Sequence, residues 1–160
     1  MVLRHVRPGD EGRLLQIFSD PTVSKWWGDP DKSVADTMQS EEGDDHYLIE
    51  VEGETVGMIQ SYQETDEMYR HAGIDISIRE PWQGKGIGPE AIRLLAHHLI
   101  DDLGHHRLVI DPAAHNANAI RAYERVGFKP VGVMRSYERA PDGTWHDGLL
   151  MEMLADELTE

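Results

Sequence analysis

The spacing of apolar residues along the chain predicts short strands alternating with amphipathic helices. Apolar residues at every second position, or in short runs between turn residues, predict strands, because neighbouring side chains of a strand point to opposite faces. Such strands are expected at residues 2–6, 46–51, 56–62, 72–78, 107–111, 131–137 and 149–154. Apolar residues three and four positions apart predict helices. These helices are expected after Asp10, after Asp31, and at residues 88–103 and 116–126.

Two of these helices carry clear apolar stripes. The helix that opens at Gly88-Pro89 has its proline in the first turn, where a missing N–H costs little, and Gly104 ends it. Its buried stripe is expected to contain Ile92, Leu95, Ala96, Leu99 and Leu103. The first helix stops at Asp20-Pro21. It is expected to bury Leu14, Leu15, Ile17 and Phe18.

The strand at residues 72–78 has an apolar and a polar face. Alternation places Ile74, Ile76 and Ile78 on one side, and Asp75 and Ser77 on the other. Asp75 is therefore expected to point away from the apolar layer.

The order of the elements predicts a mixed α/β fold. Strand, glycine-rich loop, helix, strand and helix follow one another in the C-terminal half, and an expected β-hairpin precedes them. The sheet is expected to be largely antiparallel and partly parallel. A chain of 160 residues without a linker or repeat predicts one domain, residues 1–160, with its own core.

The amino-acid composition of the chain excludes several kinds of reactive site. The chain has no cysteine, which excludes disulfides, thiolate zinc sites and a cysteine nucleophile. No stretch approaches the roughly 18 apolar residues of a membrane span, and the first residues do not resemble a secretion signal, so we expect a cytoplasmic protein without a membrane partner. The nine histidines lack metal-ligand spacing, so no metal is expected.

The charge of the chain bears on its partners. Fifteen basic and thirty acidic residues give a formal charge of −15. Such a surface repels nucleic acid and attracts cations, so a small cationic substrate is favoured over a nucleic acid. An acidic surface that only maintains solubility is the alternative.

A glycine-rich loop lies between a predicted strand and a predicted helix. In Gln83-Gly84-Lys85-Gly86-Ile87-Gly88, glycines permit close approach to the backbone, and the free N–H groups of the following helix attract phosphate. No Gly-Lys-Ser/Thr ends the loop, and Pro89 occupies the third glycine position of a dinucleotide fingerprint. Kinase-type and Rossmann sites are thus disfavoured. A glycine turn that only caps the helix is the alternative.

This loop resembles the pyrophosphate-binding signature of the GCN5-related N-acetyltransferase (GNAT) superfamily, Gln/Arg-x-x-Gly-x-Gly/Ala. Gln83, Gly86 and Gly88 occupy the signature positions, and the segment 116–128, with its final Gly-Phe, is similar to the second signature. The resemblance implies acetyl-coenzyme A as co-substrate, bound where two strands splay apart. The implied cofactor-binding residues are Ile76, Ser77, Ile78, Gln83, Gly84, Lys85, Gly86, Ile87, Gly88, Asn116 and Tyr123.

Amide formation needs an unprotonated amine, stabilisation of an oxyanion and a proton for the departing thiolate. Because cysteine is absent, we expect direct attack in a ternary complex. The resemblance implies that Tyr123 is the general acid. The candidate bases are Asp75, Asp111, Glu64 and Asp66. Asp75 is favoured because its strand carries the cofactor, and Asp111 because it ends a strand just before Pro112, so the expected catalytic residues are Tyr123, Asp75 and Asp111.

The chain further resembles the aminoglycoside 6′-N-acetyltransferase branch of the superfamily. The matching segments are Trp26-Trp27-Gly28, Gln60-Ser61-Tyr62, Gly73-Ile74-Asp75, Asp111-Pro112 and residues 119–124. The implied substrate is a polycationic sugar amine, which carboxylates and aromatic rings suit. The expected substrate-binding residues are Trp26, Trp27, Glu64, Asp66, Asp75, Asp111 and Asp142.

Several alternatives stay open at this point. The amine could instead belong to a protein N-terminus, a polyamine or a hydroxamate precursor, and a catalytically silent coenzyme A-binding domain would also keep the glycine loop. The tryptophan pair could be a core anchor of the first helix. The segment 63–71 is shorter than in the branch, and the segment 136–146 is longer. Both a monomer and a homodimer are compatible with the sequence.

Overall fold

Seven strands form one mixed sheet in the computed structural model, which describes residues 1–160. The strands are β1 (Val2–His5), β2 (Asp44–Val51), β3 (Glu54–Glu64), β4 (His71–Ile78), β5 (Arg107–Ile110), β6 (Lys129–Arg139) and β7 (Trp145–Leu154). Their order in the sheet is β1-β2-β3-β4-β5-β7-β6. Only β4 and β5 pair in parallel. The predicted mixture of antiparallel and parallel pairing is confirmed.

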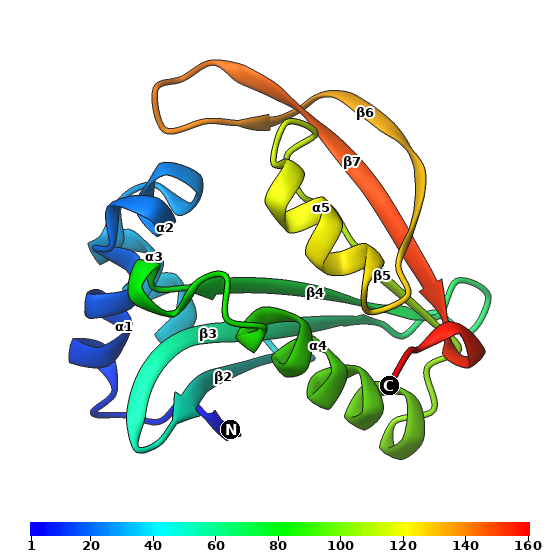
Figure 1. The fold of residues 1–160 in the computed structure, drawn as a ribbon, viewed down its shortest axis with the longest axis horizontal. Helices are drawn as coiled ribbons and strands as arrows, with labels where there is room; N and C mark the ends of the chain where they lie inside the picture. Colours follow the sequence, from blue (N-terminus) through cyan, green and yellow to red (C-terminus); the bar gives the residue numbers. More distant parts are fainter.

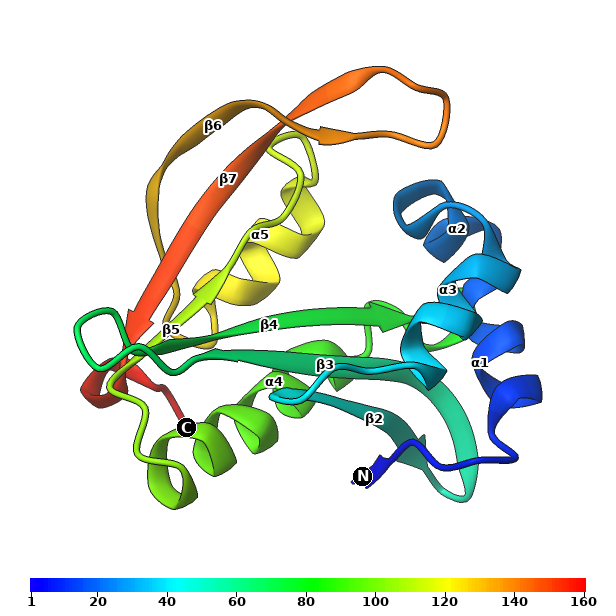
Figure 2. The ribbon, with the colours of Figure 1, turned by 180° about the vertical axis from the view of Figure 1, so that it is seen from behind.

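Helices cover both faces of this sheet. They are α1 (Glu11–Phe18), α2 (Pro21–Trp27), α3 (Pro30–Met38), α4 (Ile87–His97) and α5 (Ala117–Glu124). Figures 1 and 2 show α1, α2 and α3 gathered at one side of the sheet. The helices α4 and α5 lie apart from them and pack against a separate, larger core. A π-helical turn, His98–Asp102, extends α4. No helix is both long and apolar enough to cross a membrane.

Alternation along the strands divides the buried residues between two cores. On β3, Met58 packs with the α1 residues Leu14 and Phe18, whereas the next residue, Ile59, belongs to the core under α4 and α5. Ile74 of β4 lies in this larger core. Each face of the sheet thus receives its own helical layer, as the period of two requires.

Two details of the first helices differ from the sequence prediction. Leu15 is 40% exposed, so the buried stripe of α1 consists of Leu14, Ile17 and Phe18. The segment after Asp20-Pro21 forms its own helix, α2, which we did not predict. The Asp20 carboxylate accepts a hydrogen bond from the Thr22 N–H, so Asp20, two residues after the end of α1, caps α2.

The parallel strands β4 and β5 separate after a short contact. They pair only at Ala72 with Leu108 and at Gly73 with Val109. Beyond this point β5 turns away from β4 toward α5 (Figure 1), so residues 74–78 have no strand partner on that side. The predicted splayed pair is confirmed.

The hairpin of β6 and β7 is longer than predicted and contains a bulge. Met134 pairs with Gly148 and Glu138 with His146, so three residues of β6 oppose the single residue Asp147. Ser136 has a φ of 47°, and its N–H donates to the Asp147 carboxylate at 2.8 Å. Because a bulge bends its strand, the hairpin arches over α5 toward α2 (Figure 1).

Candidate functional site

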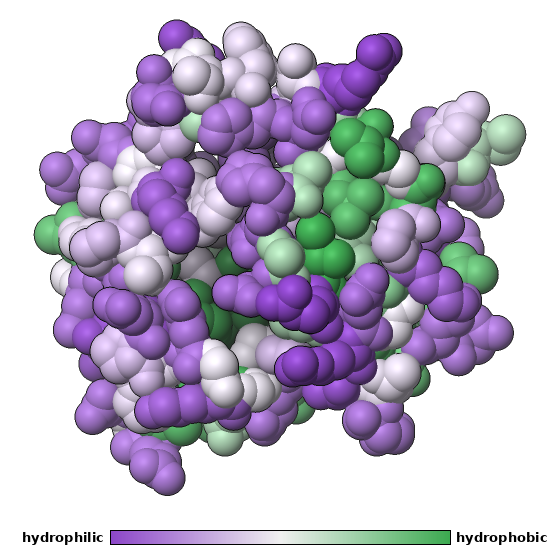
Figure 3. Space-filling view, turned by 45° about the horizontal axis from the view of Figure 1, so that its top comes forward, coloured by the Kyte–Doolittle hydropathy of each residue, from purple (hydrophilic) through white to green (hydrophobic).

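A cleft of about 1430 Å³ opens where β4 and β5 diverge. Its walls come from α2, the second half of β4, the glycine loop, α5 and the β6–β7 hairpin. Figure 3 shows a hollow on this side of the molecule with hydrophilic residues around its rim. The topology therefore brings together segments that are more than 100 residues apart in the sequence.

The glycine loop presents bare backbone to this cleft. Gly84 and Gly86 have φ angles of 71° and 80°, and a Cβ added at either residue, or at Gly88, would meet no atom within 4 Å. The helix α4 begins immediately after Gly86, so its unpaired N–H groups face the same space. This cradle fits a pyrophosphate. The side chains of Lys85, which lies over the Trp82 ring, and of the buried Ile87 do not line the cleft.

Gly86→Val is expected to weaken acetyl-coenzyme A binding by at least about tenfold, because a β-branched residue at φ 80° carries roughly 1–3 kcal/mol of backbone strain and crowds the cradle. Calorimetry of the folded variant measures the affinity. Gly53→Val is the matched control, since Gly53 has φ 84° and open space around it but lies in the β2–β3 turn. Unchanged affinity in Gly86→Val would contradict the assignment of the loop.

The unpaired part of β4 fits an extended ligand arm. Ile76, Ser77 and Ile78 line the cleft. The Ser77 hydroxyl is buried without a hydrogen-bond partner. Backbone groups without a strand partner can bind an extended chain as a further strand would. The strand and the glycine cradle together therefore fit a pantetheine arm and its pyrophosphate.

Helix α5 brings two predicted residues to the opposite wall. Asn116 caps the helix, with its side-chain oxygen accepting from the Ala119 N–H at 3.3 Å, and it also lines the cleft. Tyr123 is the buried residue of α5, and it lines the same cleft. Burial raises the pKa of Tyr123, and the charges of Asp75 and Asp111 raise it further. The phenol is therefore held protonated, as a proton donor requires.

Three carboxylates line the cleft. Asp75 extends from β4, Asp111 follows β5, and Glu138 comes from the bulged hairpin. Burial raises the pKa of Asp75 to about 6, with Asp111 and Glu138 adding to the increase and a hydrogen bond from Gln60 opposing it. Burial and Asp111 also raise the pKa of Glu138. None of the three forms a salt bridge.

Two tyrosines complete the acidic part of the cleft. Tyr137 donates a hydrogen bond to Asp111 Oδ2 at 2.6 Å, and this bond raises the Tyr137 pKa. The Tyr62 ring lies directly over Gly73, where an added Cβ would approach the ring to 1.9 Å. A larger residue at position 73 would displace the Tyr62 ring. Glu138 and Tyr137 were missed by sequence reasoning because their direction depends on the bulge rather than on regular alternation.

The tryptophan pair divides between core and cleft. Trp27 packs against Phe18 with ring centroids 5.4 Å apart and joins the core of α1, although it also lines the cleft. Trp26 faces His115 at 5.2 Å, and His115 meets His146 at 5.2 Å. Trp27 is therefore a core anchor that also forms part of the cleft wall, whereas Trp26 belongs to the cleft wall, and substrate binding by either residue stays a prediction.

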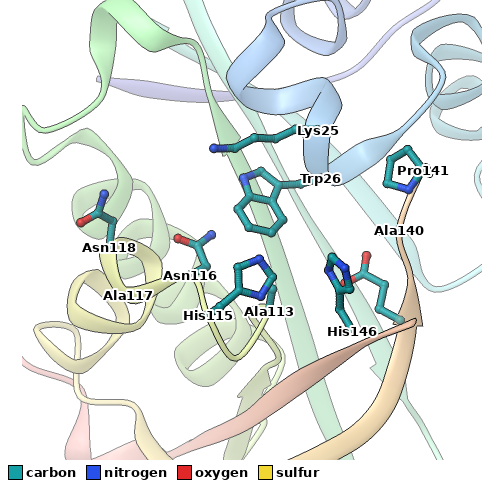
Figure 4. A pocket seen from close by; sticks show the side chains of 11 residues that line it. Lys25, Trp26, Ala113, His115, Asn116, Ala117, Asn118, Ala140, Pro141 and His146 are labelled. Carbon is teal, nitrogen blue, oxygen red and sulfur yellow. The ribbon is translucent and has the colours of Figure 1, made fainter. Parts of the chain in front are cut away.

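Trp26 and these histidines surround an adjoining pocket of about 500 Å³ (Figure 4). Glu138 and Trp26 line both this pocket and the cleft, which makes the two spaces neighbours. The sequence contained His115 and His146 but no spacing that assigned them to a site.

The structure does not bring three of the expected acids to the cleft. Glu64 ends β3 opposite His71, and Asp66 accepts from the Met68 N–H within the following turn. This turn joins the far end of β4, whereas the cleft lies at its C-terminal half. Asp142 accepts from the N–H and the hydroxyl of Thr144 in the hairpin turn. No group of three or more His, Asp or Glu side chains is arranged to hold a metal ion.

Residues 1–129 match the family model described as an acetyltransferase (GNAT) domain. The chain belongs to the GNAT family. Its splayed strands, glycine loop and α5 tyrosine are thus parts of an acetyltransferase fold, which confirms the family and the fold that the two sequence signatures implied.

Individual GNAT proteins resemble this GNAT chain to different degrees. The aminoglycoside N(6′)-acetyltransferase type 1 of Klebsiella pneumoniae is 29% identical over 89% of this chain and 79% of its own length. A solved structure of AAC(6′)-Ib in complex with Parmomycin and AcetylCoA has a TM-score of 0.78 and 27% identity, covering 99% of this chain and 97% of that chain. Spermidine N-acetyltransferase from Vibrio cholerae, solved with CoA and spermine, has a TM-score of 0.83 at 20% identity, covering 98% and 96%.

Proposed function

We propose that this acetyltransferase transfers an acetyl group from acetyl-coenzyme A to the 6′-amine of an aminoglycoside. The observation that carries the proposal is the convergence of Asp75, Asp111 and Glu138 without a basic partner. Besides burial, the Asp111 charge raises the pKa of both Asp75 and Glu138, which shows that the carboxylates repel one another in the empty cleft, and a ligand with several ammonium groups relieves this repulsion. Trp26 lines the cleft, with the Lys25 ammonium 5.1 Å from the centre of its ring, and an aromatic ring suits a sugar or a cation.

The residues around the cleft support direct transfer. Acetyl-coenzyme A supplies an activated thioester carbonyl. Asp75, with a pKa of about 6, is largely ionised at neutral pH and can accept a proton from the ammonium group of the substrate, directly or through water, which leaves the free amine that attacks the thioester carbonyl. Backbone N–H groups of residues 76–78 can stabilise a developing oxyanion. Tyr123, protonated and facing the cleft, donates the proton to the leaving sulfur.

A linear polyamine is the second candidate acceptor. It carries the same ammonium groups, so the three carboxylates accommodate it as well. The two comparisons with aminoglycoside acetyltransferases, at 29% and 27% identity over most of the chain, favour the sugar. The spermidine enzyme, at 20% identity, shares the fold.

Turnover of an amine panel, followed by release of free thiol, tests the proposal. We expect aminoglycosides with a 6′-amine to exceed matched compounds with a 6′-hydroxyl by at least about 100-fold in kcat/KM, equivalent to about 2.7 kcal/mol, since a neutral hydroxyl is the poorer nucleophile. Spermidine and a peptide N-terminus complete the panel. If either of these were the best substrate, or if the two 6′ groups reacted equally, the aminoglycoside assignment would be wrong.

A further inference from the structure

The side chain of Gln83 connects the cofactor loop to α2. Its amide Nε2 donates one hydrogen bond to the carbonyl of Ile78 and another to Thr22 Oγ1, each at 2.8 Å. The Gln83 side chain is therefore engaged with β4 and with α2, although the sequence signature indicated only a role in holding the cofactor. The bond to Thr22 joins residues 61 positions apart.

Asp20 makes a second connection between the same elements. Its Oδ1 accepts from the N–H and the hydroxyl of Thr22, and its Oδ2 accepts from the N–H of Glu80 at 2.8 Å. Burial alone would raise the pKa of Asp20, but the hydrogen bonds from Glu80 and Thr22 lower it overall. A chain of donors thus runs from the Gln83 amide through the Thr22 hydroxyl to an ionised carboxylate.

Helix α2 depends on these connections for its position. It has seven residues, of which only Val23 is fully buried. Yet it contributes Lys25, Trp26 and Trp27 to the wall of the cleft. A helix this short has little stability of its own. Its position is therefore set by the packing of Val23 and Trp27 in the core of α1, and by the bonds at its first turn.

We propose that Thr22 and the Gln83 side chain are positioning residues for the amine site, through which occupation of the glycine loop by coenzyme A raises the affinity of the cleft for its amine. The proposal rests on the proposed function only in taking coenzyme A as the ligand of the loop. A pyrophosphate held by the loop restrains Gln83, and Gln83 restrains the helix that carries Trp26. By thermodynamic linkage, the amine raises the affinity for coenzyme A by the same factor.

Thr22→Val is the direct test, because the valine side chain keeps the shape of threonine but cannot bond to Gln83 or Asp20, whereas the backbone N–H at position 22 still donates to Asp20 and keeps the helix cap. The dissociation constant of kanamycin, which has a 6′-amine, is measured by calorimetry with and without saturating coenzyme A, which cannot acetylate it. We expect coenzyme A to tighten kanamycin binding by about fivefold or more in the wild type. The factor should fall below about twofold in Thr22→Val, with coenzyme A affinity alone unchanged.

Further variants separate positioning from general destabilisation. Thr22→Ser keeps the hydroxyl and should restore the coupling. Gln83→Met removes the amide and should reduce the coupling as much as Thr22→Val does, and the double variant should lose no more than either one. Thr37→Val is the matched control, since the Thr37 hydroxyl bonds only to the Ser33 carbonyl within α3.

A measurement without an amine keeps this inference distinct from the substrate assignment. Amide hydrogen exchange of residues 22–27 should slow on addition of coenzyme A in the wild type, and this response should be absent in Thr22→Val. If the response and the coupling persisted in Thr22→Val, or were lost equally in Thr37→Val, the positioning role would be refuted. Failure of kanamycin to bind, with the exchange response present, would refute the aminoglycoside proposal alone.

Discussion

Replacing Tyr123 with phenylalanine is expected to lower kcat by about 100-fold or more, the typical lower bound for loss of a general acid. The pKa of Tyr123 is raised by burial and by two nearby carboxylates, so its hydroxyl keeps the proton that the leaving thiolate needs. That hydrogen bond strengthens chiefly in the transition state, so both substrates should bind almost as before. The rate is measured under single-turnover conditions, where chemistry limits it.

Tyr69→Phe is the control for this experiment, because Tyr69 is 72% exposed and lies in the turn between β3 and β4, away from the cleft. It should turn over like the wild type. Wild-type single-turnover rates in Tyr123→Phe would reduce Tyr123 to a packing role beside Phe128, whose ring centroid lies 6.4 Å away.

Asp75→Asn is expected to lower kcat/KM for the amine by about 100-fold or more, because it removes both a general base and a charge that holds an ammonium group. Acetyl-coenzyme A affinity should stay the same. Since the pKa of Asp75 is about 6, kcat/KM of the wild type should rise as pH increases through 6. The variant should lack this limb of the profile. A wild-type profile in Asp75→Asn would assign the base elsewhere, with Asp111 and Glu138 as the nearest carboxylates.

The same substitution should stabilise the protein at neutral pH. Folding raises the pKa of Asp75 from its ordinary value of 3.8 to about 6, so the folded state favours the protonated form. Stability from this group is full below about pH 4 and is lost as pH rises through 6. Asp75→Asn should therefore exceed the wild type by up to about 3 kcal/mol at pH 8, with the difference closing near pH 4. Urea denaturation measures it, with Asp66→Asn as the exposed control.

Local sequence determined the parts of the site that depend on short segments. The anion cradle was predicted from a few neighbouring residues, because glycines at residues 84, 86 and 88 lie between a strand and a helix. Alternation along β4 correctly predicted that Asp75 leaves the isoleucine face, because the period of a strand is a local property. The pattern from Asn116 to Tyr123 likewise predicted one short helix, which Asn116 caps and on which Tyr123 lies.

Only the tertiary structure decided which distant groups meet. Glu138 and Tyr137 enter the cleft because a bulge opposite Asp147 bends the hairpin, and a bulge breaks the alternation on which sequence reasoning relies. Glu64 and Asp66 fall outside because their turn joins the other end of β4. The role of Gln83 in holding α2 depends on a contact across 61 residues, for which no local pattern exists. Short segments of sequence therefore determine which chemical groups are present, but the packing of strands and helices determines which of these groups meet in one cleft.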